Sequence, residues 1–317
     1  MYHLLSDFLK VTEEAAIQAL PWVGSGDKNG ADQAATSAMR NQLNQMKMNS
    51  VVVIGEGEID EAPMLYINEK VGKGYGEELD IAVDPIDGTT PTVEGKDNGI
   101  AVIAAAPRGS LLHAPDMYME KMVVGKEASG VIDLEAPLLQ NLKAVAKVKN
   151  KRLDELTVLI QDRPRHADAI RIMRDNGVTV ELFQDGDILK ALLPCMKPDK
   201  YDMLYNIGGA PEGVLSAVAV KCLGGEMQAR LKFRNEEEYN RCLGMGFADP
   251  KATLQHQDLM ASEEGLFVAT AITNTVFLKG IKMESTKYRT QSLVIDNGMK
   301  DFKIVESVKE VVHSSTL

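Results

Sequence analysis

The chain has 317 residues, 44% of them hydrophobic and 26% charged, which is long enough for a substantial buried core in one domain or two lobes. Its formal net charge of −11 argues against non-specific binding to nucleic acid or to anionic membranes. An anionic substrate would therefore need local recruitment by metal ions, arginines or helix N-termini.

The chain carries no pattern of a secreted or membrane protein. Residues 1–20 mix charged and apolar residues as an amphipathic helix does, and the longer apolar runs, such as 100–106, are far shorter than a bilayer span. The cysteines Cys195, Cys222 and Cys242 lack C-x-x-C spacing, which is typical of a reducing compartment. We therefore expect a soluble cytoplasmic protein. Its five histidines form no spaced set for a metal centre.

The expected elements alternate between strands and helices along much of the chain. Helices are expected over 1–20 and 31–47, a strand over 51–54, and a helical connector over 137–150 between lobes at 1–150 and 151–317. Beyond the connector, strands are expected at 156–160, 178–183 and 203–207. Each is followed by a helix, at 166–176, from 187 and at 211–222. This pattern predicts an α/β fold in layers, with ligands outside the strand ends.

The motif around which the chain is organised is DPIDGTT at 84–90. It follows a buried apolar run, 81–83, which we expect Pro85 to stop, and Gly88 permits a tight reversal. Asp84 and Asp87 would then be held together at the end of a strand, with a threonine hydroxyl behind them. Carboxylates suit Mg²⁺ or Mn²⁺. The other interpretation is a turn with local side-chain-to-backbone hydrogen bonds.

A second acidic segment follows the expected strand at 51–54. Four carboxylates fall within the six residues 56–61, and two glycines interleave with them. Such acids repel one another unless they are solvated or share cations, and we favour a metal site that includes Glu56 over a solvated loop. Asp32 is expected in the first turn of the second helix, where a carboxylate complements the helix dipole.

Polar residues also follow the later strands. Arg163 and Arg165 flank a proline and predict a phosphate clamp, because arginine offers a planar fork of donors; the other interpretation is a basic surface turn. Asp185 and Asp187 fit either a helix N-cap or carboxylates that bind hydroxyls.

A glycine-rich segment precedes the expected helix at 211–222. Gly208 and Gly209 would expose backbone N–H groups to an oxyanion. Glu212 would either complement the helix dipole or complete a metal site. Tyr118 fits a half-buried strand position or a substrate contact.

Several segments together carry a family resemblance. DPIDGT and Glu56 are similar to the signature of the metal-dependent, lithium-sensitive sugar-phosphatase superfamily. The fuller set resembles the bacterial class II fructose-1,6-bisphosphatases over nearly the whole chain, in the segments GDKN at 26–29, IGEGEIDEAPMLY at 54–66, APDMYMEK at 114–121, DRPRH at 162–166 and GGAPEG at 208–213.

This resemblance implies a layered αβαβα sugar-phosphatase fold and hydrolysis of the 1-phosphate of fructose 1,6-bisphosphate with Mn²⁺ or Mg²⁺. It implies the metal ligands Asp32, Glu56, Asp84, Asp87 and Glu212, and a catalytic set of Thr89, Asp84 and Glu56. The implied substrate-binding residues are Gly88, Thr89, Tyr118, Arg163, Arg165, Asp185, Asp187 and Gly209. A homodimer or homotetramer is also implied. Some class II members carry Glu where this chain has Asp87.

Three alternatives remain beside this interpretation. Certain relatives also accept sedoheptulose 1,7-bisphosphate. A catalytically silent sugar-phosphate sensor could keep the same fold, although retention of the acids and Thr89 argues against it. Aspartyl-phosphate phosphatases use the motif Asp-x-Asp-Gly-Thr, whereas Ile86 stands here where the second acid would fall.

Overall fold

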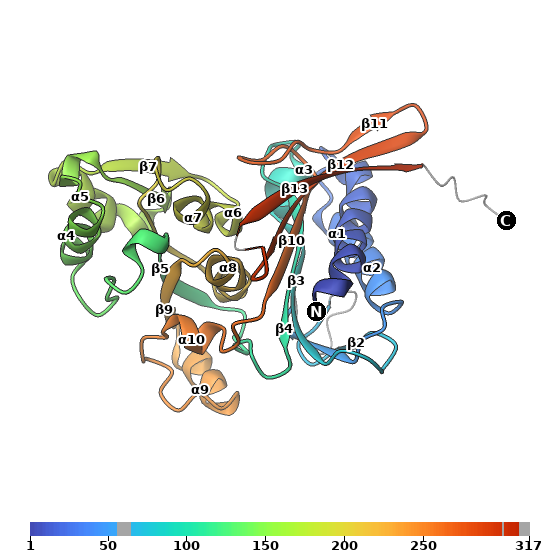
Figure 1. The fold of residues 1–317 in the computed structure, drawn as a ribbon, viewed down its shortest axis with the longest axis horizontal. Helices are drawn as coiled ribbons and strands as arrows, with labels where there is room; N and C mark the ends of the chain where they lie inside the picture. Colours follow the sequence, from blue (N-terminus) through green and yellow to red (C-terminus); the bar gives the residue numbers. More distant parts are fainter. Residues whose placement is uncertain (56–64, 300, 311–317) are drawn as a thin grey trace.

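The computed structural model describes residues 1–55, 65–299 and 301–310. Within these residues the strands form one sheet of eight and one of five (Figure 1). The strands of the first sheet are β1 (Ser50–Ile54), β2 (Lys70–Val71), β3 (Leu79–Asp87), β4 (Ile100–Pro107), β10 (Leu266–Ala271), β11 (Lys282–Glu284), β12 (Lys287–Asp296) and β13 (Phe302–Glu310). Those of the second sheet are β5 (Tyr118–Val124), β6 (Thr157–Gln161), β7 (Thr179–Phe183), β8 (Met203–Gly209) and β9 (Glu226–Lys232).

The two sheets have different strand orders. The first runs β11–β12–β10–β4–β3–β1–β2 with β13 paired to β12, and the second runs β7–β6–β8–β5–β9. In the second sheet β6 is parallel to both β7 and β8, whereas β5 is antiparallel to β8 and β9. The strand–helix alternation expected beyond residue 151 is thus confirmed, with parallel pairing among β6, β7 and β8.

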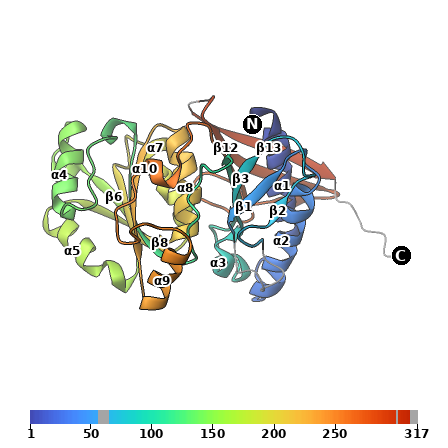
Figure 2. The same ribbon diagram turned by 90° about the horizontal axis from the view of Figure 1, so that it is seen from below.

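The helices complete five layers. Figures 1 and 2 show α1 and α2 on the outer face of the first sheet, α8 between the sheets, and α4 and α5 on the outer face of the second. The helices are α1 (Leu5–Ala19), α2 (Lys28–Leu43), α3 (Thr89–Val93), α4 (Leu138–Val148), α5 (Ala167–Asp175), α6 (Asp187–Ala191), α7 (Leu193–Met196), α8 (Ala210–Cys222), α9 (Glu236–Gly244) and α10 (His256–Leu259). The expected αβαβα arrangement is confirmed. Over the ranges given above, no helix combines the length and apolar character needed to cross a bilayer.

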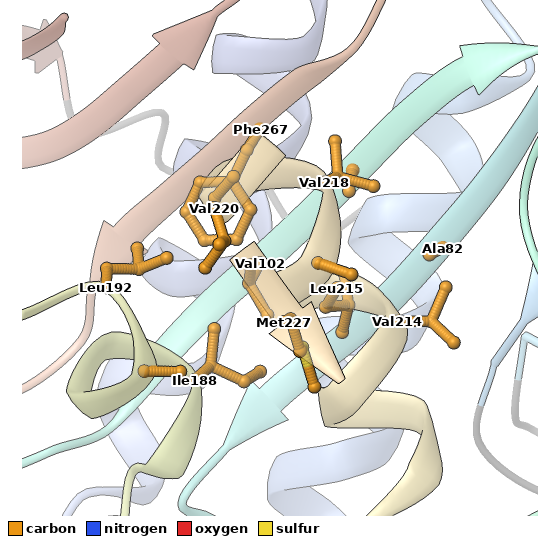
Figure 3. Close-up of a cluster of buried hydrophobic side chains, with 14 of the residues drawn as sticks. Ala82, Val102, Ile188, Leu192, Val214, Leu215, Val218, Val220, Met227 and Phe267 are labelled. Atoms are coloured by element: carbon orange, nitrogen blue, oxygen red, sulfur yellow. The ribbon is translucent and has the colours of Figure 1, made fainter. Parts of the chain in front are cut away.

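Helix α8 holds the two sheets together. It packs on β3, β4 and β10 of the first sheet and on β5, β8 and β9 of the second. Its valines, alanines and leucine are buried on all sides, as expected of a helix without a solvent face. Leu215 and Val218 lie among Val102, Phe267 and Met227, which come from both sheets (Figure 3). The core is therefore continuous across the middle layer.

The sequence predicted that Pro85 would end the strand, but β3 continues past it. It continues to Asp87, and its pairing with β4 shifts register between Asp84 and Asp87. Such an irregularity leaves residues unpaired, so a proline without an N–H group is accommodated inside a central strand. The bulge carries both aspartates to the end of the strand.

Helix α2 begins earlier than predicted. It starts at Lys28, and the side chain of Asp27 accepts a hydrogen bond from the N–H of Gly30 as its N-cap. Asp32 therefore lies in the second turn and not in the first, where its charge would complement the helix dipole most strongly. Complementing the helix dipole therefore does not explain why an acidic residue stands at position 32.

The two sheets do not follow the predicted lobes at 1–150 and 151–317. Strand β5 belongs to the second sheet although it precedes residue 150, and β10 to β13 return to the first sheet. Strand pairing across long sequence separations decides this division, because β10 inserts between β4 and β12. Local hydrophobic patterns do not report such pairing.

Helix α10 is tied to its neighbours through a histidine. Nδ1 of His256 accepts a hydrogen bond of 3.0 Å from the N–H of Met227, and Nε2 lies 2.9 Å from the carbonyl oxygen of Ala217. The ring joins β9 to α8 in its neutral form, because Nδ1 must stay unprotonated to accept. Burial is the main cause that lowers the pKa of His256 to about 4.

The first prediction concerns this histidine. Because its folded pKa lies below its ordinary value near 6.5, its contribution to stability is present above pH 6.5 and is lost as pH falls towards 4. We expect wild-type protein to lose about 1–2 kcal/mol between pH 7 and 5 through this group. The His256→Gln variant should lack that part of the loss. Urea unfolding at both pH values measures it, and equal losses in the two proteins would contradict it.

Candidate active site

The carboxyl ends of three strands of the second sheet meet at one edge. Because β6, β7 and β8 are parallel, the segments after Gln161, Phe183 and Gly209 leave the sheet on the same side. Strand β5 runs the other way and begins there, with Tyr118 opposite Gly209. This edge therefore gathers segments that are far apart in the sequence.

The carboxyl end of β3 faces this edge from the first sheet. After Asp87 the chain turns through Gly88, which has a φ of +83°, and Thr89 opens α3. A Cβ at Gly88 would lie 2.5 Å from the carbonyl oxygen of Asn98, so glycine is required for both conformation and space. The predicted tight reversal is confirmed at Gly88.

The two ends enclose a cleft of about 350 Å³. Ten predicted site residues line it, from both sheets: Asp87, Gly88, Thr89, Tyr118, Arg163, Arg165, Asp185, Asp187, Gly209 and Glu212. Asp32 lies beside it, because the hydroxyl of Thr89 is 3.1 Å from Asp32 Oδ1 and 2.9 Å from the carbonyl oxygen of Ile86. The cleft lies outside the strand ends, where the sequence analysis expected ligands to bind.

Two predicted residues do not line the cleft in the same way. Asp84 is buried with 8% exposure, and Oδ1 accepts a hydrogen bond of 3.0 Å from the N–H of Ile86 within the β3 bulge. Glu56 lies outside the described residues. Strand β1, which precedes it, pairs in parallel with β3 and ends at Ile54.

Carboxylates crowd the buried side of the cleft. Burial, followed by repulsion from Asp187 and Glu212, raises the pKa of Asp87 well above its ordinary range. Burial and the charge of Asp187 likewise raise the pKa of Glu212 to about 7. Asp87 Oδ2 and Glu212 Oε2 have no hydrogen-bond partner among the described residues. These oxygens fit the chemistry of a divalent cation, which would neutralise them.

Within residues 1–55, 65–299 and 301–310, no three acidic, histidine or cysteine side chains gather as a complete metal site. Asp87, at the end of β3, and Glu212, in the first turn of α8, supply two carboxylates to the cleft. The acidic segment predicted to supply more, with Glu56, falls in the undescribed range. The donor set is thus partly placed and chemically suited to a hard cation.

Two glycines make room for two of these acids. A Cβ at Gly209 would lie 1.8 Å from Glu212 Oε2, and one at Gly208 would lie 2.5 Å from Asp187 Oδ2. The predicted role of this segment as an open row of N–H donors is only partly right. The N–H of Ala210 already donates to the carbonyl oxygen of Met117 at 2.8 Å.

Lys121 is a site residue that the sequence analysis missed. Its ammonium donates to Asp187 Oδ2 at 2.7 Å and to the carbonyl oxygen of Gly209 at 2.9 Å, and its side chain is 3% exposed. It offsets part of the acidic charge, since its proximity lowers the pKa of Asp87 and Glu212. The sequence carried a signal for this position. Lys121 is two residues from both Met119 and Val123, so it shares the core-facing side of β5 with these buried residues.

Two arginines also line the cleft. Arg163 Nη2 donates to Asp185 Oδ1 at 3.0 Å, which pairs two predicted residues. Arg165 Nε donates to the carbonyl oxygen of Ile207 at 2.8 Å, and its guanidinium carbon lies 4.9 Å from the centre of the Tyr118 ring. The turn that carries both arginines is thereby held against β8.

Comparison with known proteins agrees with this arrangement of a layered α/β fold around an acidic and basic cleft. The family described as bacterial fructose-1,6-bisphosphatase, glpX-encoded, matches residues 2–309. The class 2 fructose-1,6-bisphosphatase of Haemophilus influenzae is 45% identical over 318 residues, covering 96% of this chain and 95% of that protein. Fructose-1,6-bisphosphatase 2 class 2 of Escherichia coli K12 is 46% identical over 321 residues, covering 97% and 100%.

A solved structure, the extragenic suppressor protein suhB from Bartonella henselae, shares 13% identity and a TM-score of 0.35, covering 60% of this chain and 73% of that one. That likeness is too weak to bear on function. The family match and the relatives at 45–46% identity define a phosphatase that acts on phosphorylated sugars. The chain belongs to the bacterial, glpX-encoded fructose-1,6-bisphosphatase family.

The second prediction tests the crowded acids by stability. In metal-free protein, Asp87→Asn should raise the free energy of unfolding by about 1 kcal/mol, because it removes a buried charge that its neighbours repel. Added Mn²⁺ or Mg²⁺ should raise the Tm of the wild type and have much less effect on the variant. Thermal unfolding with and without EDTA measures both effects.

The matched control is Asp168→Asn, a carboxylate on α5 with 89% side-chain exposure. It should change neither the metal-free stability nor the gain from metal. A variant at Asp87 that gains as much from Mn²⁺ and from Mg²⁺ as the wild type would contradict the assignment of Asp87 as a ligand.

Proposed function

We propose that this protein hydrolyses the 1-phosphate of fructose 1,6-bisphosphate and releases fructose 6-phosphate and phosphate. The observation that carries the proposal is the cleft itself, in a chain of this family. Asp87, at the end of β3, and Glu212, on α8, line it together with Arg163 and Arg165. A substrate with two phosphates needs both kinds of surface, one for the reacting phosphate and one for the phosphate that is retained.

The cofactor in this proposal is Mn²⁺ or Mg²⁺. The residues that would hold it are Asp32, Glu56, Asp84, Asp87 and Glu212. When bound, a divalent cation neutralises phosphate oxygens and lowers the pKa of a coordinated water. Support comes from Asp87 Oδ2 and Glu212 Oε2. Neither oxygen accepts a hydrogen bond from any described residue, and a bound cation would neutralise both.

Thr89 has the central role at the reacting phosphate. Its one hydroxyl hydrogen can be donated to Asp32 Oδ1 or to the carbonyl oxygen of Ile86, which leaves the lone pairs of the oxygen free to accept. In this proposal the oxygen accepts a hydrogen bond from the attacking water and orients it. Gly88 leaves the backbone open beside the phosphate, because no side chain fits there.

The retained phosphate and the sugar are assigned to the remaining residues of the cleft. Arg163, Arg165 and Tyr118 hold the phosphate, and the carboxylates of Asp185 and Asp187 accept hydrogen bonds from sugar hydroxyls, next to the backbone of Gly209. Lys121 holds the Asp187 side chain in place through its 2.7 Å hydrogen bond to Oδ2. The basic groups also answer the requirement set by a net charge of −11, since they draw an anion to one place on an acidic protein.

The third prediction concerns Thr89. Replacement by Ala should lower kcat for phosphate release about 10²–10⁴-fold with little change in KM, because only the orientation of the water is lost. Thr89→Ser keeps the hydroxyl and should retain activity within about tenfold. The assay is phosphate release from fructose 1,6-bisphosphate with Mn²⁺ or Mg²⁺. Near-wild-type turnover of the Ala variant, folded normally, would remove Thr89 from the mechanism.

The fourth prediction concerns the substrate. Across sugar mono- and bisphosphates, we expect the highest kcat/KM for fructose 1,6-bisphosphate, above sedoheptulose 1,7-bisphosphate. A higher value for the seven-carbon sugar would reassign the main substrate. Tight binding of bisphosphates by calorimetry, with no phosphate released under any metal, would instead identify a silent sensor.

A further inference from the structure

A second hollow adjoins the cleft. It has a volume of about 270 Å³ and shares Tyr118, Gly209 and Glu212 with the cleft, so the two are neighbouring compartments. Its remaining lining residues are Asp116, Met117 and Arg234. Arg234 matches no segment of the family resemblance and was not predicted to belong to the site.

Arg234 is held at its base and open at its tip. Its backbone N–H donates to Glu238 Oε2 at 2.7 Å, and its Nε donates to Glu238 Oε1. Glu238 is itself buried with 6% exposure, in the first turn of α9. The terminal nitrogens Nη1 and Nη2 of Arg234 donate to no described residue. The fork is therefore positioned in advance and available to a ligand, which reduces the entropy lost on binding.

Tyr118 is flanked by two arginines. The guanidinium carbon of Arg165 lies 4.9 Å from its ring centre, and that of Arg234 lies 6.0 Å from it. Nε and Nη2 of Arg165 already donate to the carbonyl oxygen of Ile207 and to Gln161 Oε1. Of the two arginines at this ring, Arg234 has the more donors left for a phosphate.

The hollow also contains acids, and these define the class of ligand. Asp116 and Glu212 line it together with Arg234. A bare anion would be repelled by these carboxylates, whereas a sugar phosphate offers a hydroxyl to Asp116 and phosphate oxygens to the guanidinium of Arg234. The lining is thus complementary to a phosphorylated polyol.

We propose that Arg234 is a substrate-binding residue that recognises the phosphate retained by the sugar. This inference rests on the proposed function and extends its binding site across Tyr118 into the second hollow. Arg234 acts on affinity for the doubly phosphorylated substrate and takes no part in the chemical step.

The test uses the metal-loaded protein and fructose 6-phosphate, the product that keeps the phosphate in question. Titration calorimetry should show about tenfold weaker binding for Arg234→Gln, as expected for one exposed charge-assisted contact. Arg234→Lys should fall between the variant and the wild type, since it keeps the charge but not the fork. Glu238→Gln, which loosens the base of Arg234, should also weaken binding.

The matched control is Arg171→Gln on α5. Arg171 has the same side-chain exposure as Arg234, 64%, and the substitution changes the net charge equally. It should bind fructose 6-phosphate as the wild type does. In kinetics with fructose 1,6-bisphosphate, Arg234→Gln should raise KM about tenfold with kcat unchanged, while fructose 1-phosphate, which lacks the retained phosphate, should be cleaved equally by both proteins.

Unchanged binding of fructose 6-phosphate by Arg234→Gln would overturn the inference. Equal losses for fructose 1-phosphate and the bisphosphate would overturn it too, because Arg234 would then act on something other than the retained phosphate. A wild type that releases no phosphate from fructose 1,6-bisphosphate would instead refute the proposed function. The calorimetric comparison of the variants would still report on Arg234 in that case.

Discussion

The arrangement of this molecule depends on burying like charges next to one another. Asp87 ends strand β3 of the first sheet, Asp187 begins helix α6, and Glu212 lies in the first turn of helix α8; burial raises the pKa of Asp87 and Glu212. Such a cluster opposes folding unless cations share it. Lys121 supplies one fixed positive charge, and the oxygens left without partners are suited to divalent metal. Burial of these like charges costs stability, and a divalent cation bound there would offset that cost.

The middle layer makes this convergence possible. Helix α8 packs on both sheets, and its first turn carries Glu212 towards the end of β3. The small residues Gly208 and Gly209 leave space for the carboxylates on either side of that turn. A rigid, fully buried helix therefore sets the distance between the two halves of the cleft, so that the core of the protein and its chemistry share one element.

An acidic protein that acts on an anionic ester needs positive charge concentrated in one place, and arginines gather around Tyr118. Arg163 and Arg165 project from the turn after β6, and Arg234 follows β9 at the other side of Tyr118. Each is oriented by contacts with backbone or with a carboxylate, such as the bond from Arg165 to Ile207. Charge that is scattered elsewhere on the surface would give less local attraction, because salt screens it within about 10 Å.

The sequence by itself determined the alternating elements, the layered class of fold, and ten residues of the cleft, because strand ends, glycine turns and paired acids are local patterns. It was wrong where the outcome depended on distant partners. The passage of β3 through Pro85 required a bulge against β4, and the return of β10 to the first sheet moved the boundary away from residue 150. Lys121 and Arg234 were not predicted because the contacts that place them near the cleft, with Asp187 and with Tyr118, join residues far apart along the chain. Tertiary structure decided these points, because strand pairing and the distance between charges depend on how distant segments pack together and not on local sequence patterns.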